Sequence, residues 1–309
     1  MTVEKMQLDK DELLELYNYD LELLLELASK YMSENVEICS LVNAKSGKCS
    51  QDCKYCAQSS YYRTNIESYP LIDKVQVRAA AEEAKTYNAN HFAVVTSGKT
   101  IPEPDFDKII EYIGEINKIK GLSSCASIGI LSEEQVKKLS LAGLKRVHHN
   151  INTSKSYYPE ICTTHTWQER FNTCMAVKKY KMELCCGVIL GMGESIEQRV
   201  EMAMELAEIQ PDSIPINILM PIPQTPFENY GDKIDEENVL RTLAIFKIAN
   251  PDSVLRFCGG RMLLSKQAQE TALKTCVEAI MTGNYLTTTG SNPKDDIEMI
   301  SKLGKKILK

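Results

Sequence analysis

Three cysteines stand close together in the segment GKCSQDCKYCAQSS, namely Cys49, Cys53 and Cys56. Their C-x3-C-x2-C spacing keeps all three sulfurs on one tight loop. Zinc is one interpretation, but structural zinc normally takes four protein ligands, and no fourth cysteine or histidine lies nearby in this segment. Three thiolates suit a [4Fe–4S] cluster in which one iron keeps an open coordination position. The spacing therefore predicts a cluster that binds a further ligand.

The composition excludes several other classes of protein. The chain has 309 residues and eleven cysteines, and its acidic, amphipathic first residues do not resemble a signal peptide. A secreted disulfide framework is therefore not expected. No apolar run approaches the roughly 18 residues that span a bilayer. The net charge of −6 argues against a nucleic-acid or anionic-membrane surface. We expect a cytoplasmic protein with no nucleic-acid or membrane partner.

The elements that position the cysteines follow an alternating pattern. Leucines at helical spacing predict helix over about residues 9–33. After them, amphipathic helices alternate with short apolar runs that predict strands. The candidate strands are 36–43, 91–96, 124–130, 146–151, 183–190, 213–219, 253–258 and 277–283.

This alternation predicts an α/β fold. Eight strands favour a (β/α)8 TIM-type barrel, with an open doubly wound sheet as the alternative. No linker-like composition divides the chain. We therefore expect one barrel domain over residues 36–309, preceded by an N-terminal helical extension over residues 1–35. Chemistry in such barrels sits at the C-terminal ends of the strands, and the cysteine loop follows the first strand.

The cysteine loop resembles the signature of the radical S-adenosylmethionine (SAM) superfamily, C-x3-C-x-aromatic-C, with Tyr55 as the aromatic residue. In that superfamily the open iron binds the amino and carboxylate groups of SAM. Electron transfer then cleaves SAM to methionine and a 5′-deoxyadenosyl radical. The resemblance thus implies a [4Fe–4S] cluster at Cys49, Cys53 and Cys56, with SAM bound beside it.

From about residue 36 to residue 302 the chain resembles the biotin synthase family. The segments that carry the resemblance follow the order of that family's blocks: SGKCSQDCKYCAQSS, HNINTS, TTHTWQER, GVILGMGES, SIPINILMPIPQTP and YLTTTGSNP. The resemblance implies a radical SAM sulfurtransferase that inserts sulfur into dethiobiotin to form biotin. It also implies a homodimer and an electron donor such as flavodoxin or ferredoxin.

Two other functions stay open. One is another radical SAM barrel enzyme, of the hydrogenase-maturation or methylornithine-synthase type. The other is a non-catalytic iron–sulfur carrier, which would hold clusters without a SAM pocket.

The resemblance also nominates binding residues. For SAM they are Tyr55, Asn150, Asn152, Arg170 and Ile189, and for dethiobiotin Asn150, Asn217, Thr288 and Thr289. Many members of the family carry an aspartate at position 152. Paired amide donors and acceptors suit a ribose or a urea group. Gly187 and Gly191 flank a buried strand end, where we expect side chains to obstruct an approaching ligand.

An auxiliary cluster supplies the sulfur in this family, commonly held by three cysteines and one arginine. Cys125, Cys185 and Arg256 match that pattern, but the remaining cysteine position is Ala93 here. This departure calls for replacement ligands.

Cys39 and Cys258 are the candidate replacements. Cys258 shares its side of the strand with Arg256, and alternate barrel strands share layers inside a barrel. Convergence of Cys39, Cys125, Cys185 and Cys258 favours a four-iron cluster with an extra sulfide over a [2Fe–2S] cluster. The resemblance points to the same type, found in obligate anaerobes. Cys162 and Cys276 are reserve candidates for this site.

Overall fold

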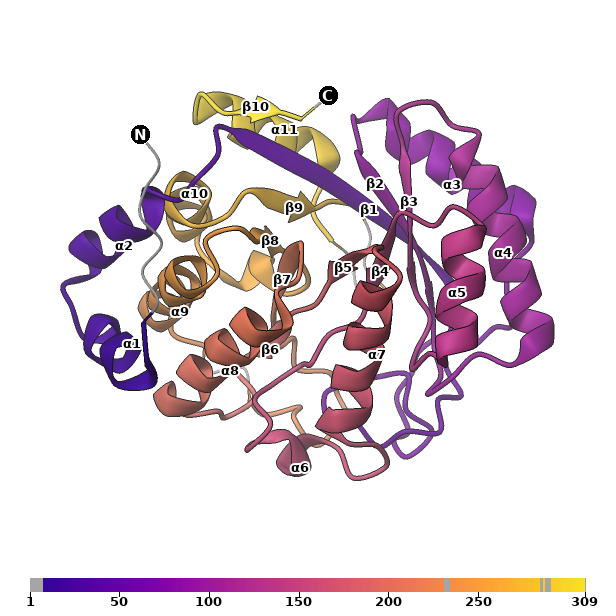
Figure 1. Cartoon of the computed structure of the whole chain (residues 1–309), viewed down its shortest axis with the longest axis horizontal. Coiled ribbons are helices and arrows are strands. Elements are labelled where there is room, and N and C mark those ends of the chain that lie inside the picture. The colour runs from indigo at the N-terminus through magenta and orange to yellow at the C-terminus, as the bar shows by residue number, and fades with distance from the viewer. Residues whose placement is uncertain (1–7, 231–233, 284–285, 287–289, 309) are drawn as a thin grey trace.

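The chain forms a closed barrel of parallel strands ringed by helices (Figure 1). The computed structural model describes residues 8–230, 234–283, 286 and 290–308. Its strands are β1 (Asn35–Lys45), β2 (His91–Thr96), β3 (Ser123–Ser127), β4 (Arg146–His148), β5 (Glu183–Cys185), β6 (Val188–Leu190), β7 (Ser213–Ile218), β8 (Val254–Phe257), β9 (Ala279–Met281) and β10 (Lys306–Ile307).

Strand β1 closes the barrel because it pairs on both of its edges. It pairs with β2 through Cys39 opposite His91, and with β9 through Cys39 opposite Met281. Neighbouring strands then follow in the order β1-β2-β3-β4-β5-β7-β8-β9, with β6 paired to β7. The predicted (β/α)8 barrel is confirmed, and the open sheet is wrong.

Two strand predictions need correction. The predicted strand 183–190 is interrupted at Cys186 and Gly187, which separate β5 from β6. Strand β10 was not predicted; it pairs Lys306 and Ile307 with the first two residues of β1. Two residues carry too little pattern to identify a strand from sequence.

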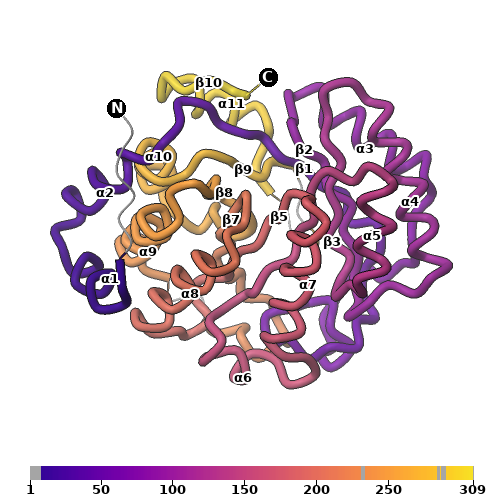
Figure 2. The backbone as a smooth tube through the Cα atoms, viewed as in Figure 1, coloured from indigo at the N-terminus to yellow at the C-terminus, as the bar shows by residue number. Residues whose placement is uncertain are grey.

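Helices follow most strands and cover the barrel (Figures 1 and 2). They are α1 (Lys10–Tyr17), α2 (Leu21–Ser29), α3 (Lys74–Thr86), α4 (Glu103–Asn117), α5 (Glu133–Leu141), α6 (Tyr158–Ile161), α7 (Trp167–Lys179), α8 (Ile196–Ile209), α9 (Glu236–Ala249), α10 (Lys266–Thr275) and α11 (Pro293–Lys302), with a 3-10 turn, η2 (Arg261–Leu263).

The N-terminal segment forms two helices where one helical stretch was predicted. The break comes at Asp20, whose side chain accepts hydrogen bonds from the backbone N–H groups of Glu22 and Leu23 and so caps α2. Helix α1 contacts α8 and α9, and α2 contacts α9 and α10. The leucines that predicted helix, such as Leu13 and Leu24, are buried in these contacts.

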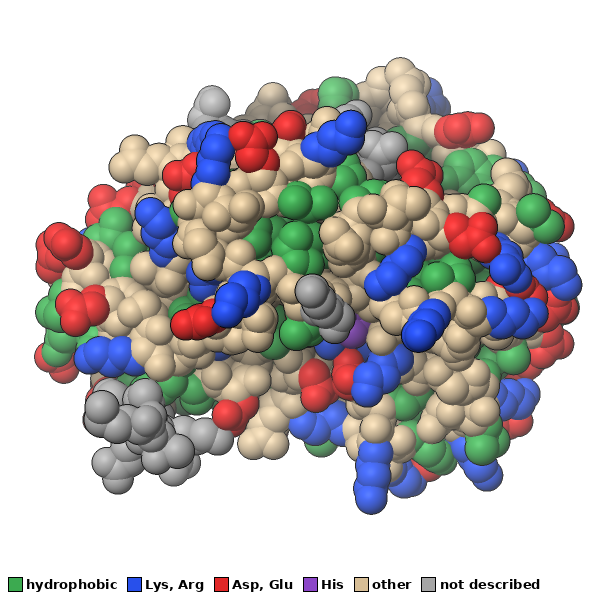
Figure 3. Space-filling model, turned by 90° about the horizontal axis from the view of Figure 1, so that it is seen from above, with side chains coloured by type: hydrophobic (Ala, Val, Ile, Leu, Met, Phe, Trp, Pro, Cys, Tyr) green, Lys and Arg blue, Asp and Glu red, His purple; other side chains and the backbone are tan. Residues whose placement is uncertain are grey.

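The face of the molecule drawn in Figure 3 has little contiguous charge of one sign. On the face drawn in Figure 3, acidic and basic side chains are intermixed around a central area where hydrophobic side chains show. None of the helices in the described residues combines the length and apolarity that a membrane crossing requires.

Gly187 is required by strand packing. A Cβ atom at this position would lie 1.9 Å from the carbonyl oxygen of Pro215 on β7. The steric constraint that the structure shows at Gly187 therefore comes from the neighbouring strand. Gly191 has a φ of 93°, which a residue with a side chain rarely adopts.

We predict that Gly187→Ala destabilises the protein by at least about 2 kcal/mol, because the added methyl must displace the β7 backbone. Gly114→Ala is the matched control, since nothing lies within 4 Å of a Cβ there and the residue is exposed on α4. It should stabilise by about 0.5–1 kcal/mol. Denaturant unfolding followed by circular dichroism measures both. Equal effects of the two substitutions would contradict this account of Gly187.

Candidate active site

The three loop cysteines line one cavity at the end of the barrel where β1 leads out. The loop folds back on itself: the backbone N–H of Cys49 donates to the Gln58 carbonyl at 2.9 Å, and that of Cys56 to the Cys53 carbonyl at 3.0 Å. Cys49, Cys53 and Cys56 then face a space of about 120 Å³. Three convergent thiols on a loop are the donor set that a [4Fe–4S] cluster with one open iron needs.

Polar groups from neighbouring strand ends complete this loop cavity. Its walls include Ser97 and Lys99 after β2, Gly129 and Ile130 after β3, and Arg170 of α7. Turns after several strands therefore converge on the cysteine loop, as expected at the C-terminal face of a barrel.

Arg170 is a fixed cation at the loop cavity. Its Nε donates to Tyr158 Oη at 2.8 Å, and its Nη1 donates to the Asn150 carbonyl at 2.9 Å. Burial opposes its charge, but Tyr158, Tyr55 and Cys53 outweigh this effect and raise the pKa of Arg170. The guanidinium is therefore available to pair with an anion beside the loop cysteines.

Tyr55 connects the loop to the strand ends. Its Oη accepts a hydrogen bond from Asn152 Nδ2 at 2.8 Å, and the Asn152 carbonyl accepts from the Ile189 N–H at 2.8 Å. Asn152 has a φ of 69°, a left-handed conformation that asparagine tolerates better than most residues. Asn150 Oδ1 accepts from the Gly187 N–H at 3.1 Å. Hydrogen bonds thus link Asn152 to both Tyr55 and Ile189, and Arg170 to Asn150.

A second cavity of about 260 Å³ occupies the barrel interior. Its walls are mostly apolar, and its polar lining includes Asn150, Asn217 and Arg256. Asn217 Nδ2 donates to the Val188 carbonyl at 3.2 Å, and its Oδ1 accepts from the Gly259 N–H at 3.1 Å. Each amide atom of Asn217 keeps one further donor or acceptor position for a ligand. Thr288 and Thr289 lie outside the described residues.

Tyr55 lines both cavities, which therefore adjoin at this residue. A molecule bound at the loop cysteines therefore lies next to the apolar barrel interior. The barrel cavity is also lined by Cys185, Arg256 and Cys258.

The buried cysteines of β1, β3 and β5, and Cys258 directly after β8, gather around Arg256. Arg256 Nη1 donates to Cys185 Sγ at 3.4 Å, and Cys39 packs with Cys258 and Met281. Burial raises the pKa of Cys39 to about 11, although the charge of Arg256 opposes this rise. The nearby charges that act on Cys125 and Cys258 likewise include Arg256, Cys39 and Cys185.

These deep residues fit an anionic cluster. Among the described residues, Arg256 Nε is buried and has no hydrogen-bond partner. An unpaired buried N–H of a guanidinium is costly unless an acceptor occupies the space beside it. Ala93 is buried against Cys125 and Val95, so the position of the missing family cysteine also belongs to this interior.

A buried charge network beneath the thiols was missed by the sequence analysis. Glu37 Oε2 accepts from Arg256 Nη2 at 2.8 Å and from Arg146 Nη1 at 3.3 Å, and lies 3.5 Å from His91 Nε2. Burial opposes ionisation of Glu37, but Arg256 and Arg146 lower its pKa. Burial, aided by Arg146, lowers the pKa of His91 to about 4. The signal was available, because Glu37 precedes Cys39 by two residues and shares its side of β1.

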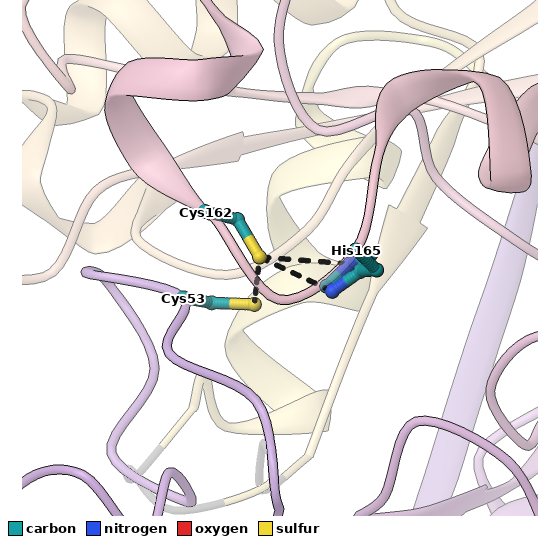
Figure 4. A group of neighbouring side chains, drawn as sticks. All are labelled: Cys53, Cys162 and His165. Carbon is teal, nitrogen blue, oxygen red and sulfur yellow. Dashed lines mark hydrogen bonds between the residues drawn. The ribbon is translucent and has the colours of Figure 1, made fainter.

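Cys162 and His165 also have unexpected places. Cys162 Sγ lies 3.7 Å from Cys53 Sγ and 3.1 Å from His165 Nδ1 (Figure 4). The prediction of Cys162 as a reserve ligand for the auxiliary group is therefore wrong. A fourth cysteine and a histidine do lie near the loop in space, although neither is near it in the sequence. Cys276, the other reserve, ends α10 beside Thr275, away from the thiols around Arg256.

Asp52 holds the segment of Cys162 against the loop. Its Oδ1 accepts from the backbone N–H groups of Thr163 at 2.9 Å and Thr164 at 3.2 Å. These contacts join residues about 110 positions apart in the chain. Only the folded backbone reveals this proximity, because neither segment has a pattern that predicts the other.

The comparisons with known proteins agree with this geometry. The profile of the radical SAM superfamily matches residues 44–207, and that of the biotin and thiamin synthesis associated domain matches residues 215–306. Among solved structures, methylornithine synthase has a TM-score of 0.83 at 16% identity, covering 98% of this chain and 95% of that one. A maturase of the [FeFe]-hydrogenase has a TM-score of 0.84 at 15% identity, covering 97% and 72%. Likeness at this identity shows the fold alone.

The curated relatives are much closer in sequence. The biotin synthase of Acetivibrio thermocellus is 45% identical over 282 residues, covering 91% of this chain and 88% of that protein. The biotin synthase of Clostridium perfringens strain 13 is 40% identical over 310 residues, covering 99% and 97%. With this identity over nearly its whole length, and with two cysteine groups inside a radical SAM barrel, the chain belongs to the biotin synthase family.

Proposed function

We propose that the two cysteine groups of this radical SAM sulfurtransferase act together to insert sulfur into dethiobiotin and form biotin. The observation that supports this most is the position of Tyr55, which lines both the loop cavity and the barrel cavity. A radical made from SAM at the loop then meets a substrate in the barrel without crossing water. Exclusion of water matters because a primary radical must meet only its intended hydrogen.

When bound, the [4Fe–4S] cluster supplies the electron that cleaves SAM, and the auxiliary cluster supplies the sulfur. Cys49, Cys53 and Cys56 hold the first. Arg170 pairs with the SAM carboxylate, and Asn152, positioned by its hydrogen bond to Tyr55, meets the ribose. The backbone hydrogen bond from Ile189 to Asn152 keeps these contacts at one strand end.

Dethiobiotin occupies the barrel cavity. Asn217, with its remaining donor and acceptor positions, meets the ureido ring, and Asn150 contacts both SAM and substrate. The apolar walls, which include Leu41 and Val95, suit the hydrocarbon part of the molecule. Thr288 and Thr289 receive the substrate carboxylate in this proposal, on the family resemblance alone.

Cys39, Cys125, Cys185 and Cys258 hold the auxiliary cluster, with Arg256 as a ligand or charge partner. Four thiols are a ligand set that either a [2Fe–2S] or a four-iron cluster takes. The unpaired Arg256 Nε offers a donor to one further anion, and with it we favour a four-iron cluster with an extra sulfide over a [2Fe–2S] cluster. Ala93 supports the same choice, because the usual ligand at that position is absent.

The remaining parts of the proposal rest on sequence and family resemblance. They are a homodimer, an electron donor of the flavodoxin or ferredoxin kind, a cytoplasmic location, and a division into an extension (1–35) and a barrel domain (36–309).

Anaerobic turnover tests the overall reaction. With reductant, SAM and dethiobiotin, we expect biotin in proportion to enzyme, together with 5′-deoxyadenosine, both read by mass spectrometry. Cys49→Ala should abolish both products, while Cys276→Ala, which removes a buried thiol outside both groups, should retain them. Formation of 5′-deoxyadenosine without biotin, with both clusters intact, would contradict the substrate assignment.

Arg170→Gln tests the SAM carboxylate contact. Loss of a hydrogen bond to a charged group costs about 1.5–3 kcal/mol, so the KM for SAM should rise about 10–100-fold. Arg170→Lys keeps the charge and should recover part of the loss. Arg78→Gln, on the exposed side of α3, should leave KM unchanged. Equal KM values for the Gln and Lys variants would show that Arg170 only supports its neighbours.

Cys39→Ala tests the altered ligand set of the auxiliary cluster. Iron and sulfide counts after reconstitution should fall by up to about half, because the loop cluster stays and the auxiliary one is lost. Cys276→Ala, also fully buried, should keep the wild-type counts. Unchanged counts in Cys39→Ala would remove Cys39 from the ligands.

A further inference from the structure

Cys53, Cys162 and His165 form a compact group of metal-ligating side chains beside the loop cavity. One ligand atom from each lies within 4.8 Å of the other two, and all three side chains are buried. Cys53 comes from the cysteine loop, and the other two come from the segment between α6 and α7 (Figure 4). The three face one another from two elements that Asp52 holds together.

The spacing of the two sulfurs fits a single metal ion. Two thiolates on one tetrahedral zinc ion, with Zn–S distances of about 2.3 Å, stand about 3.8 Å apart. The Cys53 and Cys162 sulfurs are 3.7 Å apart. In a [4Fe–4S] cluster each terminal thiolate binds a different iron, so its ligand sulfurs are more widely separated. Cys162 is therefore placed to share a mononuclear ion with Cys53, and it is not placed as a fourth cluster ligand.

The surroundings of His165 suit its use as a ligand. Nδ1 faces Cys162 Sγ at 3.1 Å, and Nε2 lies 2.8 Å from Tyr158 Oη. In the metal-free protein Nδ1 also faces Gln51 Oε1 at 3.0 Å, and Nε2 accepts from Arg170 Nε at 3.2 Å. Metal binding through Nδ1 therefore requires the proton to move to Nε2 and Gln51 to turn away, after which Nε2 donates to Tyr158 Oη as an outer contact that orients the histidine. Asp52 Oδ1, 3.2 Å from Cys162 Sγ, adds negative charge near the ion. The positive charge of Arg170, whose Nε lies 3.2 Å from His165 Nε2 on the far side of the ring, acts against a cation at this site.

We propose that Cys53, Cys162 and His165 bind one Zn²⁺ ion in the cluster-free protein. Two thiolates and one imidazole are ligands that zinc prefers, and water takes the fourth position. Because Cys53 also belongs to the loop cluster, zinc and the [4Fe–4S] cluster exclude each other. This second part rests on the proposed cluster ligands; the zinc site itself rests on the geometry of the three side chains.

Zinc titration of the anaerobic, reduced, cluster-free full-length protein tests the site. Wild type and Cys276→Ala should each bind one more equivalent of zinc tightly than Cys162→Ala. Cys162→Ala should weaken zinc binding at this site by more than the roughly 10–100-fold that loss of an outer contact causes. Cys162→Ala should still take up iron when reconstituted without zinc, which verifies its fold. An identical zinc stoichiometry and affinity in Cys162→Ala would overturn the proposal.

X-ray absorption at the zinc edge of the wild-type protein gives a test that needs no variant. The expected spectrum contains a nitrogen and two sulfurs for this ion, whereas zinc among the thiols around Arg256 would show sulfur alone. Protein preloaded with zinc should also take up less iron than zinc-free protein, and Cys162→Ala should lose this difference. A sulfur-only spectrum would refute the zinc site. Full iron uptake in the presence of zinc would refute the mutual exclusion of zinc and the [4Fe–4S] cluster. Neither measurement requires SAM or dethiobiotin, so failure here is distinct from failure of the proposed reaction.

Discussion

Strand β1 is the constraint on which the rest of the molecule depends. Its pairing with both β2 and β9 closes the sheet, and closure turns alternate residues of every strand toward one axis. On β1 itself, Glu37 and Cys39 reach the deep end of the barrel. The same strand then leads directly into the cysteine loop. One element therefore connects the two cysteine groups, and a slip of its register by one residue would turn Glu37 and Cys39 away from the barrel interior.

Charged side chains surround the four thiols at the deep end of the barrel. Arg256 is fully buried, and a buried guanidinium is tolerated only with compensation. Glu37 compensates one side of it through a 2.8 Å contact, while the Nε side stays unpaired within the described residues. Arg146 and neutral His91 then hold Glu37 in place. The arrangement leaves positive charge directed at the four thiols, which suits a cluster that carries negative charge.

The sequence was sufficient for the fold and for the loop cysteines, because both depend on local patterns. Strand-by-strand alternation also predicted that Arg256 and Cys258 face the same cavity. Contacts between distant segments were not predictable in the same way. The approach of Gly187 to Pro215 depends on how neighbouring strands pack, and the meeting of Cys53 with Cys162 depends on how two loops approach each other. Glu37 could have been found by extending the alternation on β1 by two residues.

The central proposal is that the two cysteine groups hold separate iron–sulfur clusters, one at the loop and one among the thiols around Arg256. Anaerobic crystals of the reconstituted protein, measured at the iron absorption edge, test it most directly. The account predicts one anomalous peak among Cys49, Cys53 and Cys56, and a second among Cys39, Cys125, Cys185 and Cys258 beside Arg256. Iron at the loop alone, with the four deep cysteines as free thiols in fully reconstituted and active enzyme, would contradict it.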